Sequence, residues 1–342
     1  MSTASLTASK DPLWHAYDLA MLDLDGVVYV GPEAVPGAPG HLEAARAAGQ
    51  RLAYVTNNAS RTPDAVAQHL RDLGVTVADE DVVTSAQAAA RLLGDRFEKG
   101  SAVFTIGGRG LEVALDERGL RSTQDPDDDP VAVVSGFSAD LRWGTVIAGA
   151  ILVRGGLPWV ASNTDLTVPT PHGPGPGNGA LVDVVARFAE REPVVAGKPE
   201  SPLFEETLRR VGGHRPLVVG DRLDTDIEGA RKVGYDSLLV MTGVTDARTL
   251  VGAAPEVRPT YVAADLAALG KPQPQVEVEG GAAESDGWRA QVRDGTLCVE
   301  GEGDPDGWWR VVAVAGWQHL DTTGDAPDVS RLRPAEGSGG SV

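Results

Sequence analysis

The sequence predicts an α/β protein with a doubly wound, mostly parallel sheet, an inserted second α/β block and a small β-rich C-terminal extension. Apolar, β-branched runs alternate with helix-period segments from about Trp14 to Gly270. This alternation is typical of parallel strands whose connecting helices cover both faces of a sheet. Beyond Gly270, the linker-like stretch KPQPQ is followed by segments with a period of two, which favours hairpins.

Eight apolar runs predict the strands, and four segments with helical period predict helices between them. Proline follows a capping residue at Pro63 and Pro202, and several of the helical segments end at glycine, as helix start and stop signals should. The strand runs are LAMLDL, RLAYVT, AVFTIG, VAVVSG, PWVAS, PVVAG, PLVVGD and SLLVM. The helical segments are APGHLEAARAAG, TPDAVAQHLRDLG, SPLFEETLRRVGG and TDIEGARKVG.

These patterns predict the domain boundaries. Residues 14–84 and 192–270 form the core, 85–191 the inserted block, and 276–330 an extension that packs on the core or lies at a subunit interface. The tails 1–12 and 331–342 are predicted to be disordered. The stretch TPHGPGPGNG (170–179) is predicted to be a loop because of its Pro and Gly. In the extension, WRAQVRDGTLCVEGE and WWRVVAVAGWQHL alternate apolar and polar residues, with a DG turn at 294–295.

Composition excludes several classes of protein. The chain has 342 residues, 42% of them apolar, and no apolar run approaches the roughly 18 residues of a membrane span. The single cysteine, Cys298, cannot form an intramolecular disulfide, which predicts a cytoplasmic protein. With 49 acidic and 30 basic residues the formal charge is −19. This charge disfavours nucleic acid and anionic membranes as partners, while a homo-oligomer stays open.

The stretch LAMLDLDGVVYVG places Asp23 and Asp25 at the end of an apolar strand, directly before Gly26. One interpretation is a turn with a solvated face, because strands often end in Asp or Gly. The other is a site, because residues i and i+2 of an extended chain point to the same side. Two such carboxylates could hold a hard cation or divide the work of nucleophile and proton shuttle.

Three further strands end in polar residues. RLAYVTNN ends in Thr56, Asn57 and Asn58, PVVAGK ends in Lys198, and LVVGDRLDTD carries Asp221 and Asp226. Helix capping explains several of these residues equally well. A phosphate site at helix starts is the functional alternative.

Taken together, the motifs DxDG, TN, K and GDxxxTD, on four strands of one α/β pattern, resemble those of the haloacid-dehalogenase-like phosphatases. The resemblance covers roughly Trp14 to Gly270 and is strongest to the subfamily with a large α/β cap between the second and third motifs. That subfamily includes p-nitrophenylphosphatase-like, phosphoglycolate and pyridoxal phosphate phosphatases. The C-terminal extension makes the chain most similar to the actinobacterial glycerol-3-phosphate phosphatases. The resemblance implies a Rossmann-like core.

The resemblance also implies a role for each acidic residue. Asp23 would be the nucleophile that forms an aspartyl phosphate, and Asp25 the acid and base that serves the leaving group and the attacking water. The Asp23 carboxylate, the main-chain carbonyl of Asp25 and Asp221 would bind Mg²⁺. Asp226 would orient these ligands from outside.

The remaining site residues would bind the substrate. Thr56, Asn57, Asn58 and Lys198 would hold the transferring phosphoryl group. From the cap segment SNTDLT, Asn163 and Asp165 would contact the leaving group.

The expected activity is Mg²⁺-dependent hydrolysis of a small phosphorylated metabolite, with glycerol 3-phosphate ranked before phosphoglycolate and pyridoxal phosphate. Two alternatives stay open: a phosphotransferase or phosphomutase that uses the same aspartyl phosphate, and a catalytically silent binding protein. The intact Asp23, Asp25, Lys198 and Asp221 argue against the last.

Overall fold

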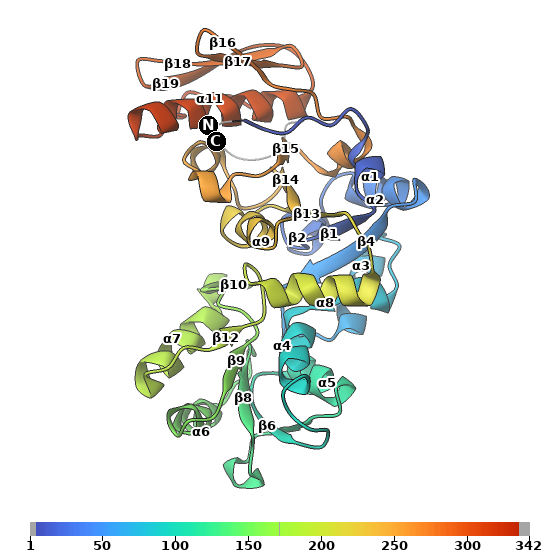
Figure 1. The fold of residues 1–342 in the computed structure, drawn as a ribbon, viewed down its shortest axis with the longest axis vertical. Helices are drawn as coiled ribbons and strands as arrows, with labels where there is room; N and C mark the ends of the chain where they lie inside the picture. Colours follow the sequence, from blue (N-terminus) through green and yellow to red (C-terminus); the bar gives the residue numbers. More distant parts are fainter. Residues whose placement is uncertain (1–4, 171, 335–342) are drawn as a thin grey trace. The chain divides into compact units, whose positions relative to one another are not determined.

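The computed structural model describes residues 5–170 and 172–334, which divide into two compact units. Unit 1 consists of the segment that ends at Ala53, of Leu73–Thr76, and of the segment that starts at Gly213. Unit 2 consists of Tyr54–Asp72 and Val77–Gly212. Unit 1 therefore contains both the blue and the orange-to-red parts of the chain in Figure 1.

A parallel sheet forms the centre of unit 1. Its strands are buried along almost their whole length, which is why the sequence shows continuous apolar runs there. Leu19 lies opposite Pro216 in the pairing of the two central strands. Residue Arg51, at the start of a further strand, donates from its backbone N to Asp18 O at 3.1 Å. In order, the strands are β15 (Tyr261–Ala263), β14 (Asp236–Val240), β13 (Pro216–Gly220), β1 (Leu19–Leu22) and β4 (Arg51–Thr56).

Short helices and one ribbon complete the part of unit 1 that precedes residue 271. They are α1 (Leu13–Ala16), β2 (Tyr29–Val30), β3 (Glu33–Ala34), α2 (Ala38–Ala47), η3 (Leu223–Ile227), α9 (Glu228–Lys232), α10 (Ala247–Val251), η4 (Pro255–Val257) and η5 (Leu266–Gly270).

Unit 2 contains the end of β4, which pairs in parallel with β5 (Val82–Thr84), and a second parallel sheet. The order of that sheet is β12 (Val194–Val195), β9 (Trp159–Ala161), β8 (Ala132–Ser135), β6 (Ala102–Ile106) and β7 (Arg121–Thr123). Its helices are α3 (Pro63–Asp72), η1 (Asp79–Asp81), α4 (Ser85–Gly94), α5 (Arg109–Glu117), η2 (Pro126–Asp128), α6 (Trp143–Arg154), α7 (Asn178–Ala189) and α8 (Ser201–Val211).

The predicted fold class is confirmed, and each of the eight apolar runs contains a strand. Two details differ. The predicted loop 170–179 lies partly in an antiparallel ribbon of β10 (Thr167–Thr170) and β11 (Gly173–Pro176), because a two-stranded ribbon needs few backbone donors and so tolerates Pro. Strand β12 belongs to the sheet of the inserted block, so this block extends beyond the predicted boundary at residue 191.

The C-terminal extension contains β-hairpins, as predicted, joined in a four-stranded antiparallel sheet, but also a long helix. The sheet comprises β16 (Glu277–Glu279), β17 (Ala282–Ser285), β18 (Trp288–Arg293) and β19 (Thr296–Gly301). The turn between β18 and β19 has positive φ at Asp294 and Gly295, as the DG pair predicts.

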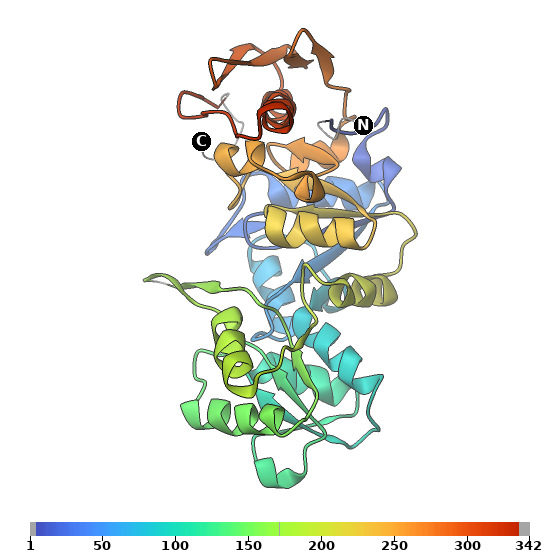
Figure 2. The same cartoon turned by 60° about the vertical axis from the view of Figure 1, so that its left-hand side comes forward.

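The segment WWRVVAVAGWQHL is helical and lies in α11 (Pro305–Thr323), so its assignment to hairpins was wrong. Asp304 caps this helix through a side-chain bond to Asp306 N, and Gly324 ends it in the left-handed conformation. Figure 2 shows α11 end-on, between the antiparallel strands and the orange part of unit 1. Burial on both sides makes the helix apolar almost all round, which removes the helical period.

Residues 5–12 are ordered, contrary to the prediction of a disordered tail over 1–12. Leu6 is buried, and Ser9 exchanges two backbone hydrogen bonds with Gln273, at 2.7 and 2.8 Å. At the other end Leu332 is buried as well, contrary to the disorder predicted for this position. Residues 1–4 and 335–342 lie outside the described residues. Across the described ranges, no helix has the length and apolar character that a membrane span requires.

Candidate active site

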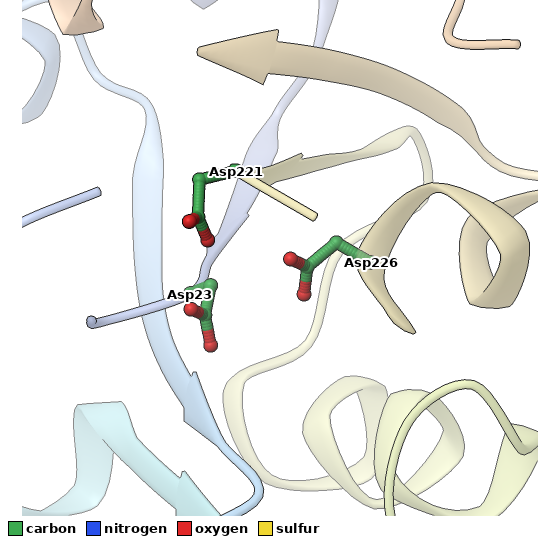
Figure 3. A group of neighbouring side chains, drawn as sticks. All are labelled: Asp23, Asp221 and Asp226. Carbon is green, nitrogen blue, oxygen red and sulfur yellow. The ribbon is translucent and has the colours of Figure 1, made fainter. Parts of the chain in front are cut away.

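Three carboxylates converge beyond the carboxyl ends of two neighbouring strands in unit 1. Asp23 follows β1 and Asp221 follows β13, and Asp23 N donates to Val219 O at 2.8 Å. Asp226 comes from η3, a single turn of π-helix. One oxygen atom of each carboxylate lies within 4.8 Å of the others, and Figure 3 shows the three side chains pointing toward one another. Asp221 and Asp226 are buried, and Asp23 is half-buried.

Backbone N–H groups hold two of these carboxylates in place. Asp221 Oδ2 accepts from Val244 N at 2.6 Å, and Asp226 Oδ2 accepts from Arg222 N at 3.2 Å. The main-chain oxygen of Asp221 accepts from both the N and the Oγ1 of Thr245, at 3.2 and 2.6 Å. The orientation of Asp221 therefore depends on the segment that follows β14.

Three glycines let the backbone close around the same two side chains. A Cβ at Gly243 would lie 2.0 Å from Asp221 Oδ2, and one at Gly26 would lie 2.3 Å from that atom. A Cβ at Gly220 would lie 2.2 Å from the Cβ of Asp226. No larger residue fits at these positions without displacing a carboxylate. The three glycines therefore form a tight cradle, in which the backbone closely surrounds the carboxylate oxygens of Asp221 and Asp226.

This cradle fits a hard divalent cation. Three carboxylates at this separation repel one another strongly when they are shielded from water, and a cation relieves the repulsion. Carboxylate oxygens are the ligands that Mg²⁺ prefers. Asp23, Asp221 and Asp226 thus surround a site suited to Mg²⁺, and the predicted division into ligands (Asp23, Asp221) and an outer partner (Asp226) stays a prediction.

Asp25 lies outside this carboxylate group. Strand β1 ends at Leu22, and a turn follows in which Val28 N and Tyr29 N donate to Leu24 O. Both aspartates thus lie beyond the last residue of the strand, and the expectation that they share one face stays a prediction. Asp25 is exposed, and its predicted contribution to Mg²⁺ through the main-chain carbonyl stays a prediction.

A second group of predicted residues is brought together in unit 2, around Asn57. Asn57 Oδ1 accepts from Lys198 N at 2.8 Å, and its Nδ2 donates to Lys198 O at 3.0 Å and to Asp165 Oδ1 at 3.2 Å. Lys198 is only 3% exposed, and its Nζ donates to Val55 O at 3.3 Å. Asn57, Asp165 and Lys198 therefore form one hydrogen-bonded network.

Asn163 supports this network from a buried position. Its Nδ2 donates to Asn57 O at 2.6 Å, and its Oδ1 accepts from Asp165 N at 3.1 Å. Because both ends of the amide are engaged, we revise its predicted role from substrate contact to positioning of Asn57.

Asn58 and Thr56 form hydrogen bonds with residues close to them in the sequence. Asn58 is exposed and its Oδ1 accepts from Ser60 N at 2.9 Å, while Asn58 N donates to Thr56 Oγ1 at 3.1 Å. The side chain of Asn58 thus forms the turn that the capping interpretation describes.

Sequence reasoning missed two residues of the unit 2 network and the segment that holds Asp221. Ser85 Oγ donates to Asn57 O, and Asn178 Nδ2 donates to Asn163 O, each at 2.6 Å. Both residues lie at the start of a helix, where a polar residue is read as a cap. The Val244 and Thr245 contacts with Asp221 are made mainly by the backbone, which leaves no signature in the sequence.

Two family models match the chain. A model described as haloacid dehalogenase-like hydrolase matches residues 20–121, and one described as HAD-hydrolase-like matches residues 195–269. The first begins inside β1, and the second ends inside η5. Together they include all four predicted motifs.

Named relatives agree with these models. The chain is 42% identical over 290 residues to D-glycerol 3-phosphate phosphatase from Mycobacterium tuberculosis, which covers 85% of this chain and 80% of the relative. It is 34% identical to an acid sugar phosphatase from Staphylococcus aureus, over 73% of this chain and 95% of the relative.

Solved structures are similar as well. The crystal structure of glycerol phosphate phosphatase from Mycobacterium tuberculosis in complex with magnesium superimposes with a TM-score of 0.81 at 40% identity, over 90% of this chain and 92% of that one. The crystal structure of 4-nitrophenylphosphatase from Thermotoga maritima superimposes with a TM-score of 0.70 at 30% identity, over 75% of this chain and 98% of that one. From the two matching models and these relatives, the chain belongs to the haloacid dehalogenase-like hydrolases.

Proposed function

We propose that the protein is a Mg²⁺-dependent phosphatase that hydrolyses small phosphomonoesters, glycerol 3-phosphate first among them, through an aspartyl phosphate on Asp23. The observation that carries the proposal is the convergence of Asp23, Asp221 and Asp226 beyond two adjacent parallel strands. The relatives named for glycerol phosphate support the choice of substrate.

In the first step a carboxylate oxygen of Asp23 attacks the phosphorus atom. A new P–O bond forms to Asp23, and the bond from phosphorus to the ester oxygen breaks. The electron pair of that bond stays on the leaving alkoxide, and protonated Asp25 gives it a proton. The alcohol, glycerol in the case of glycerol 3-phosphate, is then free to leave.

In the second step water hydrolyses the aspartyl phosphate. Asp25, now a carboxylate, takes a proton from the water while the water oxygen attacks phosphorus. The bond between phosphorus and Asp23 breaks, which releases inorganic phosphate and restores both aspartates. Bound Mg²⁺ supplies charge neutralisation for the dianionic phosphoryl group.

The network around Asn57 has the phosphoryl-binding role in this proposal. Thr56, the backbone N–H of Asn57 and the Lys198 ammonium bind phosphoryl oxygens, and the Asn57 side chain fixes the Lys198 backbone. Asp165 is the candidate for contact with the leaving group, since it is half-buried and bonded to Asn57. The inserted block, whose sheet extends to β12, serves as the cap that selects the substrate.

A screen of phosphorylated metabolites tests the proposal. Purified protein is incubated with glycerol 3-phosphate, phosphoglycolate, pyridoxal phosphate, sugar phosphates or p-nitrophenyl phosphate, with Mg²⁺ or with EDTA, and free phosphate is measured. We expect Mg²⁺-dependent phosphate release without any acceptor, with the highest kcat/KM for glycerol 3-phosphate. Release only in the presence of an acceptor would indicate a phosphotransferase, and no release from any ester would refute the proposal.

The proposal includes a cytoplasmic location and self-association. The one cysteine, Cys298, is a free thiol, as is usual in a reducing compartment. Exposed apolar side chains on α6, at Trp143, Ile147 and Ile151, repeat every four residues and offer a surface for a second copy of the chain. Light scattering after gel filtration distinguishes a monomer from a homo-oligomer.

A further inference from the structure

The C-terminal extension is connected to the carboxylate site by a short path of direct contacts. We propose that α11 positions Asp221 through α10, and that Gly316 and Trp317 are the positioning residues. The inference rests on the proposed Mg²⁺ site of Asp23, Asp221 and Asp226, and it assigns to the extension a task in metal binding.

The first step of the path joins α11 to α10. Trp317 is fully buried and its Nε1 donates to Leu250 O at 2.7 Å. One residue earlier, Gly316 lets the two helices approach, because a Cβ there would lie 2.5 Å from the Cβ of Val251. The position of α10 is therefore fixed by α11 at two successive residues.

The second step joins α10 to Asp221. Asp246 caps α10 by accepting from Thr249 N at 2.7 Å. The two residues before this cap are Val244 and Thr245, whose three hydrogen bonds hold the carboxylate and the main-chain oxygen of Asp221. A shift of α10 must therefore be taken up by the segment that orients Asp221.

Core packing also connects α11 with Asp226, through the turn η3 that carries this residue. Leu223 and Ile227, at the two ends of η3, belong to the same buried cluster as Trp308 and Trp309 of α11. Well-packed interiors transmit displacements because they contain few voids. The two carboxylates that the glycine cradle encloses are thus both supported by the helix that ends the fold.

A matched pair of glycine substitutions on α11 tests this inference. Gly316→Ala directs a methyl group at Val251 of α10, whereas Gly307→Ala directs one at Asp286 of the extension, with its Cβ 2.6 Å from the Cβ of that residue. Each variant adds one methyl group to the same helix at a similarly close contact. Mg²⁺ affinity is measured by calorimetry on the full chain, together with the melting temperature and with kcat and the apparent KM for Mg²⁺.

We expect Gly316→Ala to raise the Kd for Mg²⁺ by roughly threefold to tenfold, somewhat less than the loss of a direct outer partner of a metal ligand. The apparent KM for Mg²⁺ should rise in parallel, while kcat at saturating Mg²⁺ recovers. Gly307→Ala should leave the Kd within about twofold, whatever its effect on melting. Equal Mg²⁺ affinities in the two variants at equal stability would overturn the inference.

A second pair keeps the test decisive if Gly316→Ala does not fold. Trp317→Phe removes the hydrogen bond that the indole N–H donates to Leu250 O. Trp288→Phe removes a similar hydrogen bond within the extension, from the indole N–H to Asp304 O at 3.0 Å. Only Trp317→Phe should weaken Mg²⁺ binding. Failure of the wild-type chain to bind Mg²⁺ would instead refute the proposed metal site itself.

Discussion

The side chain of Asn57 forms two hydrogen bonds with the backbone of a single residue, Lys198, which follows it by 141 positions. The amide accepts from the N–H and donates to the carbonyl of Lys198, so it fixes the peptide on both sides of that residue's Cα. A residue predicted to bind phosphate thus uses its side chain to fix the backbone of the lysine that we propose for the same role.

Replacement of Asn57 by alanine should therefore lower kcat by roughly a hundredfold, the effect of a misplaced catalytic group. The melting temperature should fall as well, because the buried N–H of Lys198 loses its acceptor. Asn58→Ala is the matched control, since that side chain is exposed and accepts hydrogen bonds from Ser60 and Arg61 of its own turn. Steady-state kinetics on p-nitrophenyl phosphate measure the effect. Equal loss in both variants would show that the Asn57–Lys198 contact has no catalytic importance.

Replacement of Asp23 by asparagine should abolish turnover, with a loss on the order of a thousandfold or more, because an amide is a poor nucleophile. The melting temperature should stay the same or rise, since one of three converging charges is removed. Near-normal kcat in this variant would exclude the aspartyl phosphate mechanism.

Substitutions of Asp25 and of Asp221 should differ in their effect on Mg²⁺ binding. Asp221→Ala removes a buried member of the carboxylate group and should abolish binding measured by calorimetry. Asp25→Asn should lose turnover but keep Mg²⁺ binding, because its expected ligand is a main-chain oxygen. Asp224→Asn is the control, an aspartate of the same segment whose side chain is 65% exposed. Loss of Mg²⁺ binding in Asp25→Asn would contradict this division of roles.

Glu206 should control the acid stability of unit 2. Burial alone would raise the pKa of this fully buried carboxyl, but hydrogen bonds from Arg209 and Arg210, and the charges of Arg210 and Arg118, outweigh burial and leave the pKa below its usual value. The resulting stabilisation is present at neutral pH and is lost as the pH falls below about 4.5.

Glu206→Gln should accordingly lower the free energy of unfolding by about 3 kcal/mol at pH 7, because it leaves arginines without their buried partner. The difference from the wild type should shrink as the pH falls toward 4. Glu205→Gln, whose side chain is 52% exposed, should cost roughly 0–1 kcal/mol. Urea unfolding at several pH values measures both. A difference that does not change with pH would contradict the assignment.

Truncation after Gly270 should prevent folding of unit 1. From the sequence alone we expect such a chain to keep its activity, since all four motifs precede that point. The structure reverses this expectation, because Trp308, Trp309 and Trp317 share one buried cluster with Leu239 and Met241 of the parallel sheet region. The truncated chain should be insoluble or bind hydrophobic dyes, and a soluble, active product would show that the extension is dispensable.

The parts of the fold that were predictable have strong local signals. Strands β1 and β13 are buried on both faces, so their continuous apolar runs stand out, and the acidic residues Asp23 and Asp221 mark their ends. Helix α11 was not predictable by period, because burial on two sides makes its apolar residues appear at every position. The ordering of Leu6 could not be predicted, because Leu6 packs in a buried cluster whose other residues lie more than two hundred positions away.

Unit 1 is built from segments that lie far apart in the chain, and this limits the order in which the protein can fold during synthesis. Strand β1 has its neighbour β13 almost two hundred residues downstream, with Leu19 opposite Pro216. At about 5–20 residues per second, β1 leaves the ribosome about 10 to 40 seconds before its partner. Throughout that interval β1 can pair with β4 on one side only, so its other apolar edge stays open, and α11, which packs on the same core, is synthesised later still. Production of this enzyme in active form should therefore depend on chaperones that protect the first fifty residues until translation ends.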